Sequence, residues 1–325
     1  MRRFILLVIL AVLVISASAQ SSSAKKYIKK YDVINILKDL PKGNAEKFWD
    51  TLHDQNKRVQ ELGNAIELGN KTALQAADDL MKTCTVMQYY DVEADGYQEL
   101  TDRLVKELGL EDEKKQNHIK VINDDSFNAS MDPMGQMRIN TGAIRALNYE
   151  ELRAVCAHEV AHLACMHTFD RAWKNEKKKK RNRFWAELGT GLLVGAAAAS
   201  AGYGIANGVE TRSANSILAN TGYFLEVSHA DESTLRYKFR YSRDEEVEAD
   251  IIAYRFVEYM GYGTEHLISA MKKMERASEH TAASKYDSHP LPALRLEILQ
   301  ALKNGFEGKG SSKKKKQSPS DDMYK

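Results

Sequence analysis

Cysteine, net charge and internal repeats are all scarce in this 325-residue sequence. The absence of a repeat of fixed period excludes a solenoid or repeat array. The three cysteines, Cys84, Cys156 and Cys165, allow at most one disulfide and leave one thiol free. Because Cys156 and Cys165 are nine residues apart on one expected helix, their side chains point to opposite sides. Any disulfide must therefore include Cys84.

The N-terminus has the three parts of a secretory signal peptide. Arg2 and Arg3 precede an apolar run over 4–15, and Ala-Ser-Ala at 17–19 matches a small-residue cleavage site. The run is shorter than the roughly 20 residues that span a bilayer, so cleavage is favoured over an uncleaved membrane anchor, which stays the alternative. The prediction is a signal peptide over 1–19 and a chain secreted across the cytoplasmic membrane, periplasmic or membrane-associated on the non-cytoplasmic side.

Basic and acidic residues balance in the expected mature chain. The sequence has 47 Lys and Arg against 45 Asp and Glu, and residues 1–19 contain two arginines and no acid. A formal charge of zero gives no support for nucleic acid as a partner. No cysteine lies near Ala19, so a lipid-modified N-terminus is not expected.

Composition divides the rest of the chain into three regions. Residues 20–117 carry charges along apolar stripes and few breakers, which predicts a helical region. Residues 118–304 hold the motifs of interest, and 305–325 is a low-complexity basic tail expected to be disordered. Within the middle region, 188–208 is uncharged and rich in Ala and Gly. A buried or membrane-surface hairpin is favoured there, because Ala and Gly carry little transfer energy, and a membrane span over 188–206 stays the alternative.

A short β-element precedes the main motif. Ile119 and Val121 alternate with polar neighbours, as do Met137 and Ile139. The sequence DPMG supplies turn chemistry between the two runs. These patterns predict a small antiparallel sheet.

The stretch AHEVAHLACMH, residues 157–167, carries the chemistry. Residues four apart share a helix face, so His158 and His162 can point their ring nitrogens at one metal ion. Glu159 is offset by one residue, where it can take a proton from water; this is the H-E-x-x-H arrangement of zinc peptidases. The alternative is a buried helix that happens to contain histidines, but buried polar groups need partners. His167 falls off this face and is expected to be structural.

Capping patterns bound this helix and a second one. Asn148 can cap the first helix with Glu151 as its capping-box partner. Ser242 and Glu245 form the same pattern at the start of the second, and Gly261 ends it.

The second helix, over 241–261, offers the third protein ligand that a catalytic zinc needs. Glu246 and Asp250 share one otherwise apolar face. One carboxylate can bind the metal while the other accepts an N–H from a ligand histidine. Glu245 and Glu248 fall on other faces and are expected to be solvated. A surface helix with ordinary acids is the alternative.

A last segment, YDSHPLPALRLEILQAL over 286–302, places His289 before a proline-rich bend and Arg295 on the following helix. Polar or cationic groups opposite a metal can stabilise the oxyanion of a tetrahedral intermediate. Spacing alone leaves this role open beside that of a helix cap or a surface residue.

Four ordered segments together resemble the HtpX-like and CAAX-prenyl-protease zinc metallopeptidases, peptidase family forty-eight of the metallo class. The segments, within residues 118–302, are FNASMDPMGQMRINTGAI, EELRAVCAHEVAH, SRDEEVEAD and SHPLPALR. The resemblance implies one Zn²⁺ per chain, held by His158, His162 and Glu246. It also implies Glu159 as general base, Asp250 as the carboxylate behind a ligand, and His289 and Arg295 on the transition-state side. In some members the corresponding histidine fills the metal's open position and holds the enzyme latent.

The fold implied is a mainly helical (α+β), zincin-type domain with a small antiparallel sheet. Its edge strand is expected beside the zinc helix, where a substrate adds as a further β-strand. The residues expected along that edge are Met137, Arg138, Ile139 and Asn140.

The function implied is an exported zinc endopeptidase that acts on misfolded or stalled envelope or secretory proteins, with possible peripheral membrane contact. The full set of spans of the integral-membrane members is absent, which argues against a prenyl-protein substrate. A latent or chaperone-like binding protein with a structural zinc site is the alternative, although a structural site has no use for Glu159. A membrane-embedded protease is a third hypothesis, and it depends on 188–206.

Overall fold

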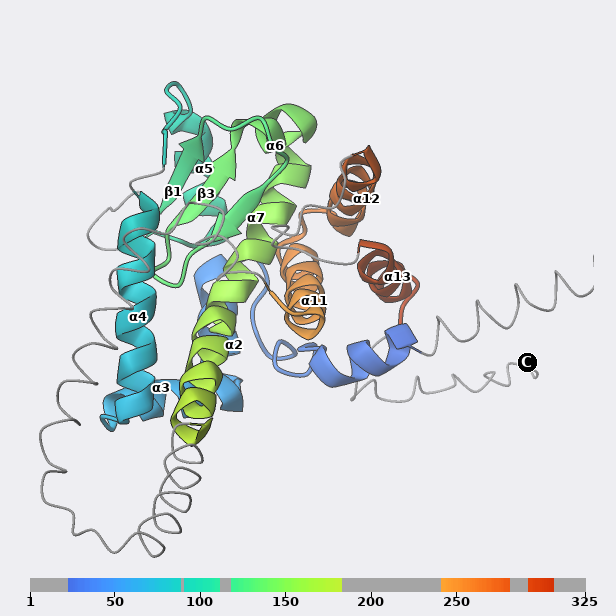
Figure 1. The fold of residues 1–325 in the computed structure, drawn as a ribbon. Coiled ribbons are helices and arrows are strands. Elements are labelled where there is room, and N and C mark those ends of the chain that lie inside the picture. The colour runs from blue at the N-terminus through green and yellow to red at the C-terminus, as the bar shows by residue number, and fades with distance from the viewer. Residues whose placement is uncertain (1–22, 89–90, 112–117, 183–240, 281–291, 307–325) are drawn as a thin grey trace, which may run out of the picture.

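The computed structural model describes residues 23–88, 91–111, 118–182, 241–280 and 292–306 (Figure 1). The predicted signal peptide, the 188–208 hairpin, His289 and the basic tail lie outside these residues. The chain folds into a mainly helical structure with one small sheet, as predicted. Its elements are α2 (Ala45–Gln55), α3 (Lys57–Glu67), α4 (Lys71–Met87), α5 (Gln98–Leu108), β1 (Ile119–Ile122), β2 (Ala129–Met131), β3 (Met137–Asn140), α6 (Thr141–Ala146), α7 (Tyr149–Ala164), α11 (Arg243–Met260), α12 (Thr264–His280) and α13 (Pro292–Lys303).

The two motif-bearing helices begin where their caps predict. In α7 the Asn148 side chain accepts from the Glu151 amide, while the Glu151 carboxylate accepts from the Asn148 amide. Ser242 and Glu245 make the same reciprocal pair at the start of α11. Gly261, at φ 73°, ends α11 in the left-handed conformation that glycine adopts without strain. Each capping box fixes the first turn of its helix and hence the direction in which the later ligands point.

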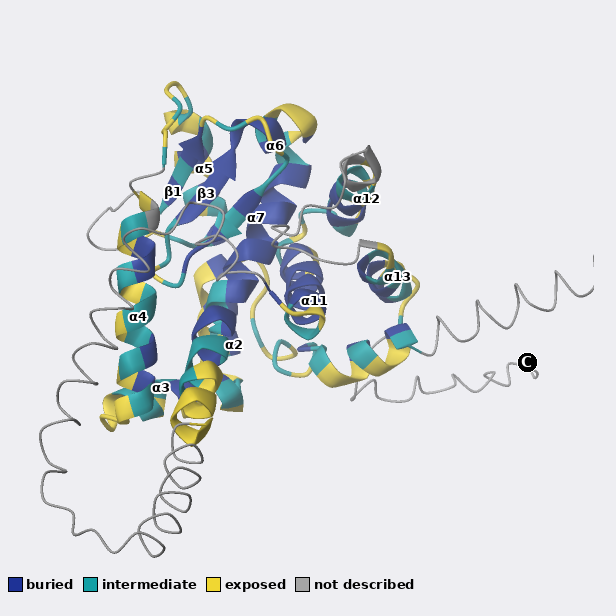
Figure 2. Cartoon of the chain, viewed as in Figure 1, coloured by how far each residue is buried: buried dark blue, intermediate teal, exposed yellow. Residues whose placement is uncertain are grey.

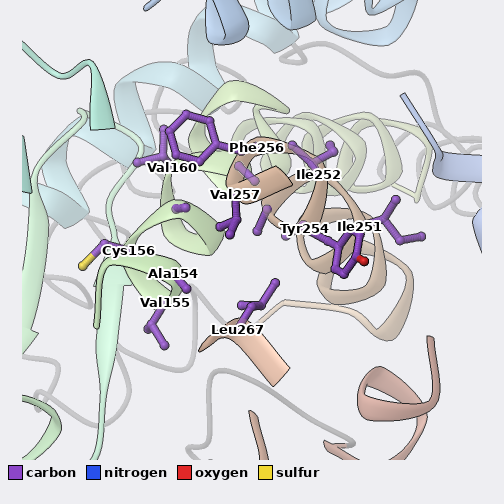
Figure 3. Close-up of a cluster of buried hydrophobic side chains, with 14 of the residues drawn as sticks. Ala154, Val155, Cys156, Val160, Ile251, Ile252, Tyr254, Phe256, Val257 and Leu267 are labelled. Carbon is purple, nitrogen blue, oxygen red and sulfur yellow. The ribbon is translucent and has the colours of Figure 1, made fainter. Parts of the chain in front are cut away.

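The centre of the molecule is the contact between α7 and α11, which are buried along most of their lengths (Figure 2). Their apolar side chains interdigitate in one cluster (Figure 3). The labelled members are Ala154, Val155, Cys156 and Val160 of α7, Ile251, Ile252, Tyr254, Phe256 and Val257 of α11, and Leu267 of α12. Burying one such large apolar side chain contributes about 1.5–3 kcal/mol. The polar residues of both helices are enclosed by this core, so they require partners inside it.

The sheet has three strands in the order β1-β3-β2, with β1 parallel and β2 antiparallel to β3. The sheet is therefore mixed: the predicted antiparallel pairing is confirmed for β2 with β3 and is wrong for β1. The cause is a strand that the alternation pattern did not reveal, Ala129–Met131. This strand and β3 flank the DPMG turn, so β2 takes the antiparallel place expected for 119–121. β1 pairs with the other side of β3 and runs parallel to it.

The prediction that Met137–Asn140 forms the sheet's edge is also wrong. β3 has hydrogen-bonded neighbours on both sides, and all four of its residues are buried. The Arg138 side chain, 3% exposed, binds Asp91 at 2.8 Å and Asp132 at 3.0 Å. Met137 and Ile139 belong to the core. An added strand cannot pair with β3; the strand that packs against α7 is β2, which has an outer edge.

The N-terminal helices pack onto this core rather than apart from it. Phe256 of α11 stacks on Trp49 of α2, with ring centroids 4.6 Å apart and planes at 20°. Asp32, after a helix over 23–31, accepts from Arg255 of α11 at 2.9 and 2.8 Å. α3 and α4 lie beside the helix that follows α7 (Figure 1), with Leu62 and Phe169 in a shared apolar cluster. The region before residue 93 thus lies against both motif-bearing helices.

Two further expectations concern cysteines and membranes. All three cysteines are buried and free, so the one possible disulfide through Cys84 is not formed. Over the ranges that the structure describes, we find no helix with both the length and the apolar character needed to cross a membrane.

Candidate metal centre

Three buried side chains converge where α7 crosses α11. His158 and His162 project from one face of α7, and Glu246 reaches them from the first turn of α11. The Nε2 atoms of His158 and His162 are 3.1 Å apart. Glu246 Oε2 lies 3.5 Å from His158 Nε2, and Glu246 Oε1 lies 3.6 Å from His162 Nε2. The expected ligand set is thus brought together from two helices, with Glu246 more than 80 residues beyond His162 in the sequence.

These spacings fit a zinc ion. In a tetrahedral site with bonds of about 2.1 Å, neighbouring ligand atoms are about 3.4 Å apart. The distance between the two ring nitrogens lies within a few tenths of an ångström of that value. Each nitrogen also lies at about that distance from Glu246, His158 from Oε2 and His162 from Oε1. Two imidazole nitrogens and one carboxylate oxygen are also the donor set of catalytic zinc sites, which leave a fourth position open. With exposures of 4%, 1% and 0%, His158, His162 and Glu246 are fixed by the core and need little rearrangement to bind an ion.

Glu159 lies between this site and the sheet. It is 1% exposed, and its Oε2 accepts a hydrogen bond of 3.1 Å from the Met131 amide at the end of β2. The carboxylate therefore sits next to the strand edge that faces α7. Tyr241 closes the same side: its hydroxyl donates to the Met131 carbonyl at 3.3 Å, and its ring stacks on His162 at 3.5 Å between centroids.

His158 is supported directly by a carboxylate and an arginine. Asp250 Oδ1 lies 2.9 Å from His158 Nδ1, one helical turn beyond Glu246. Arg295 of α13 donates to both oxygens of Asp250, at 2.6 and 2.8 Å. Arg295 is 1% exposed and also approaches Glu246 Oε2 at 2.8 Å. The structure thus places Asp250 behind the ligand, as predicted, and places Arg295 against two carboxylates.

His162 is supported through a second histidine. His167 Nδ1 lies 2.9 Å from His162 Nδ1, and His167 Nε2 lies 3.3 Å from Glu248 Oε2. Arg58 of α3 donates to both oxygens of Glu248, at 3.1 and 3.2 Å. The predictions that His167 falls away from this face and that Glu248 is solvated are wrong. The reason is a break after α7: Met166 adopts φ 52°, and the turn brings the next helix, starting at 167, back toward His162.

Neighbouring positive charges keep the buried carboxylates of this cluster ionised. Burial alone raises the pKa of Asp250, but Arg295 and His158 outweigh it and hold the pKa below its usual value. Burial acts on Glu248 in the same way, and there His167 and Arg58 hold the pKa low. Burial lowers the pKa of His158, yet Asp250 and Glu246 raise it to about 9. The cluster therefore attracts positive charge, as a site for a divalent cation must.

The structure accounts for the predicted site residues unequally. It joins six of them in one buried cluster: His158, Glu159, His162, Glu246, Asp250 and Arg295. Met137, Arg138, Ile139 and Asn140 lie in the centre of the sheet, and His289 falls outside the described residues. Sequence analysis missed the contacts of Tyr241, Glu248 and Arg58. The Glu-x-Glu-Ala-Asp run already held Glu248, but nothing in the spacing pointed to Arg58, almost 200 residues away.

Comparisons with known proteins identify the family of the chain. The model of peptidase family M48 matches residues 93–303. Metalloprotease LoiP of Escherichia coli (strain K12) is 26% identical over 166 residues, which cover 51% of this chain and 54% of LoiP. Metalloprotease YcaL of the same organism is 23% identical over 198 residues, covering 61% of this chain and 66% of YcaL. The chain therefore spans less than two thirds of either relative. Since the family model covers well over half of the sequence and contains both ligand-bearing helices, the chain belongs to peptidase family M48.

Proposed function

We propose that the chain is a zinc-dependent endopeptidase that hydrolyses peptide bonds in proteins. The observation that carries the proposal is the convergence of His158, His162 and Glu246 at tetrahedral spacing, with Glu159 beside them. When bound, zinc supplies a Lewis acid that polarises the scissile carbonyl and makes water acidic enough to attack it.

Glu159 is the proton carrier in this proposal. Its carboxylate is buried beside the ligands without being one of them, so it is placed to accept a proton from the attacking water. It then delivers that proton to the amide nitrogen that leaves. A structural site requires the three ligands but has no work for such an acid, which favours an enzyme over a structural metal site.

The outer edge of β2 is the proposed place for substrate. The Asn128 carbonyl and the Asp132 amide pair toward β3, so alternation turns the backbone groups of Ala129 and Met131 outward. The amide and carbonyl of Met131 already bind Glu159 and Tyr241, so Ala129 is the residue proposed to pair with substrate. An extended peptide that pairs there lies against Glu159 and beside the ligands. A cavity of about 320 Å³ adjoins this edge, lined among others by Met131, His162 and Tyr241, and can take a side chain of the bound segment.

Pairing through backbone groups favours unfolded segments over particular sequences. Main-chain hydrogen bonds are common to all extended peptides, whereas a folded domain offers no free strand. Together with the signal-peptide pattern over 1–19, this supports misfolded or stalled secretory proteins as substrates, on the non-cytoplasmic side of the membrane, with peripheral membrane contact possible.

The test uses the chain without residues 1–19, its zinc content and its cleavage of casein. Glu159→Gln removes the proton carrier and leaves the three ligands in place. We expect one zinc per chain in the parent and the variant, with cleavage slowed by about 10²–10⁴-fold in the variant. Glu150→Gln is the matched control, since it makes the same change on α7 at a half-buried residue that binds Arg153 rather than the metal site. It should keep full activity.

The other outcomes contradict the proposal in different ways. Zinc in both proteins without cleavage by either points to a latent or chaperone-like binding protein, the alternative raised by the sequence. Zinc in neither protein overturns the metal site itself.

A further inference from the structure

We propose that His167, Glu248 and Arg58 form a hydrogen-bond chain that fixes the tautomer of His162, so that the N-terminal helices take part in metal binding. The inference rests on the zinc site proposed above and assigns positioning roles to three residues that do not touch the metal. Arg58 lies outside the segment that the family model covers.

The chain begins at a salt bridge between two distant helices. Arg58, in the first turn of α3, makes two parallel N–H contacts to the Glu248 carboxylate at 3.1 and 3.2 Å. It also donates to the Cys165 carbonyl at 3.3 Å, in the turn that follows α7. Asn56 caps α3 by accepting from the Arg58 amide at 3.1 Å, which fixes where this arginine leaves the helix. One guanidinium therefore holds both Glu248 and the turn that presents His167.

The direction of the hydrogen bonds follows from the fixed charge at one end. Glu248 is ionised beside Arg58 and can only accept, so His167 Nε2 must carry the proton across the 3.3 Å contact. The other nitrogen of a neutral His167, Nδ1, then has a lone pair. At 2.9 Å it can only accept from His162 Nδ1–H. His162 is thereby left with its lone pair on Nε2, the atom that faces His158 and Glu246.

A ligand histidine needs this tautomer to bind a metal ion. Outer partners that hold the tautomer and ring orientation of a ligand are worth about 10–100-fold in metal affinity. Burial makes the arrangement strict here, because His167 is 0% and His162 1% exposed, and water cannot replace a lost partner.

The backbone conformation at Met166 supports a role for the contact between His162 and His167. Met166 is the one non-glycine residue at positive φ within the described ranges, at 52°. A left-handed conformation is strained for a residue with a side chain, because Cβ comes too close to the following carbonyl oxygen. Without this turn His167 continues the helix of His162 and faces elsewhere, since residues five apart do not share a face. The fold accepts local strain and gains the contact between the two rings.

A second metal ion is the competing use of the same residues, because Cys165, His167 and Glu248 place three possible ligand atoms within 4.8 Å of one another. The geometry favours the hydrogen-bond chain. Both Glu248 oxygens are already held by the parallel N–H pair of Arg58. At Glu246, by contrast, the ion pair with Arg295 joins Oε2 alone. Burial also raises the pKa of the Cys165 thiol, and a thiol binds metal poorly until it is deprotonated.

The experiment measures zinc affinity by competition with a chromogenic chelator, and zinc per chain by atomic emission. His167→Leu removes both hydrogen bonds and should weaken zinc binding about 10–100-fold. His167→Gln keeps one acceptor and one donor and should lose less. Arg58→Ala should fall between the parent and His167→Leu. Arg58→Lys, which keeps the charge without the parallel N–H pair, should lose less than Arg58→Ala and guards against a variant that fails to fold.

Arg255→Ala is the matched control. Arg255 also binds a carboxylate of the N-terminal region with two N–H groups, those reaching Asp32, but it supports no ligand. It should lower stability and leave zinc affinity unchanged.

The outcomes separate this inference from the proposed function. A parent that binds no zinc overturns the proposed function and this inference with it. A parent that binds one zinc, with the same affinity in a folded His167→Leu, overturns only the hydrogen-bond chain. Two zinc ions per parent chain, falling to one in His167→Leu, assign these residues to a second metal site instead. Histidine nitrogen NMR of the zinc-loaded parent reads the tautomers directly: His162 protonated at Nδ1 supports the chain, and any other assignment refutes it.

Discussion

The two histidines of α7 that we propose as metal ligands are each held in place by a different set of residues. Behind His158 stands Asp250, held by Arg295, and every member of this set is buried to within 5% exposure. Behind His162 stand His167 and then Glu248, held by Arg58, whose side chain is 32% exposed. In both sets an arginine fixes a carboxylate, and the carboxylate sets the orientation of an imidazole. Asp250 contacts His158 directly (the direct support), whereas Glu248 reaches His162 through the ring of His167 (the relayed support).

The two sets differ in which part of the chain they come from. The Asp250 set lies wholly within the segment shared with the M48 family, on α7, α11 and α13. The Glu248 set ends on α3, before that segment begins. Because Asp250 and Arg295 are fully buried and Asp250 contacts His158 directly, we expect the loss of either residue to cost much stability. The set behind His162 ends at Arg58, which is partly exposed, so we expect its loss to cost less stability. Because Arg58 belongs to α3, this set also links the proposed metal site to the packing of the N-terminal helices.

Asp250→Asn should have the largest effect. The amide keeps the shape but loses the charge, so buried Arg295 is left with Glu246 alone. Breaking a buried pair from one side costs about 3–5 kcal/mol, and the remaining contact to Glu246 places the expected loss near the lower end. Zinc affinity should fall by about 10–100-fold. Urea unfolding of the metal-free protein and chelator competition measure the two effects.

Asp244→Asn is the control for that experiment. Asp244 lies on the same helix but is half exposed and binds Lys30 and Tyr31. Exposed pairs contribute about 1 kcal/mol or less, and this one is remote from the ligands. If Asp250→Asn proved no more costly than Asp244→Asn, the direct support would not be the stronger of the two.

Much of the direct support was predictable from sequence. The spacing of His158 and His162 places them on one face, and the same logic pairs Glu246 with Asp250 one turn apart. Helix periodicity is a local property, and the capping boxes at Asn148 and Ser242 fix where each period begins. Periodicity alone does not say which carboxylate binds the metal and which stands behind a histidine; the resemblance to the family implies that assignment.

The relayed support and the sheet were not predictable, because both depend on contacts between distant segments. His167 was expected off the face because a continuous helix was assumed, and the break at Met166 has no glycine or proline to announce it. The alternation over 137–140 indicates a strand with one buried face, whereas the structure buries both faces, and it does not say which strands lie beside it. The sequence pattern does not reveal the short strand β2. The strand predicted to be the edge of the sheet, 137–140, is therefore its central strand.

Glu248→Gln should have a smaller effect than Asp250→Asn, with zinc binding weakened about tenfold. Glutamine still offers an oxygen to His167, but it can equally donate its amide protons, so the direction of the chain is no longer imposed. Arg58 loses its partner yet is partly hydrated, so we expect a loss of stability of about 1–2 kcal/mol. Chelator competition on both variants, side by side, checks the order. A larger loss of affinity for Glu248→Gln would reverse the comparison between direct and relayed support.

Glu151→Gln should have the smallest effect and none on zinc. Glu151 sits at the far end of α7 from the ligands, where it binds Lys273 and Ser269 of α12, both at 2.6 Å, and caps its own helix. Burial raises the pKa of Glu151, but Lys273, Ser269 and the Asn148 amide outweigh it and lower the pKa overall.

A carboxyl whose pKa is lower in the folded state stabilises the fold above its unfolded pKa of about 4.3, and this stabilisation is lost as the pH falls through the folded value. Glutamine keeps the capping contact but not the charge. Because glutamine keeps hydrogen-bonding capacity at this buried position and loses only the charge, the parent should be about 1 kcal/mol more stable than Glu151→Gln at pH 7, with the gap closing below about pH 4. Urea unfolding between pH 3 and 7 measures the gap. A change in zinc affinity at pH 7 would mean that α7 transmits changes along its whole length, so that neither histidine's support is local.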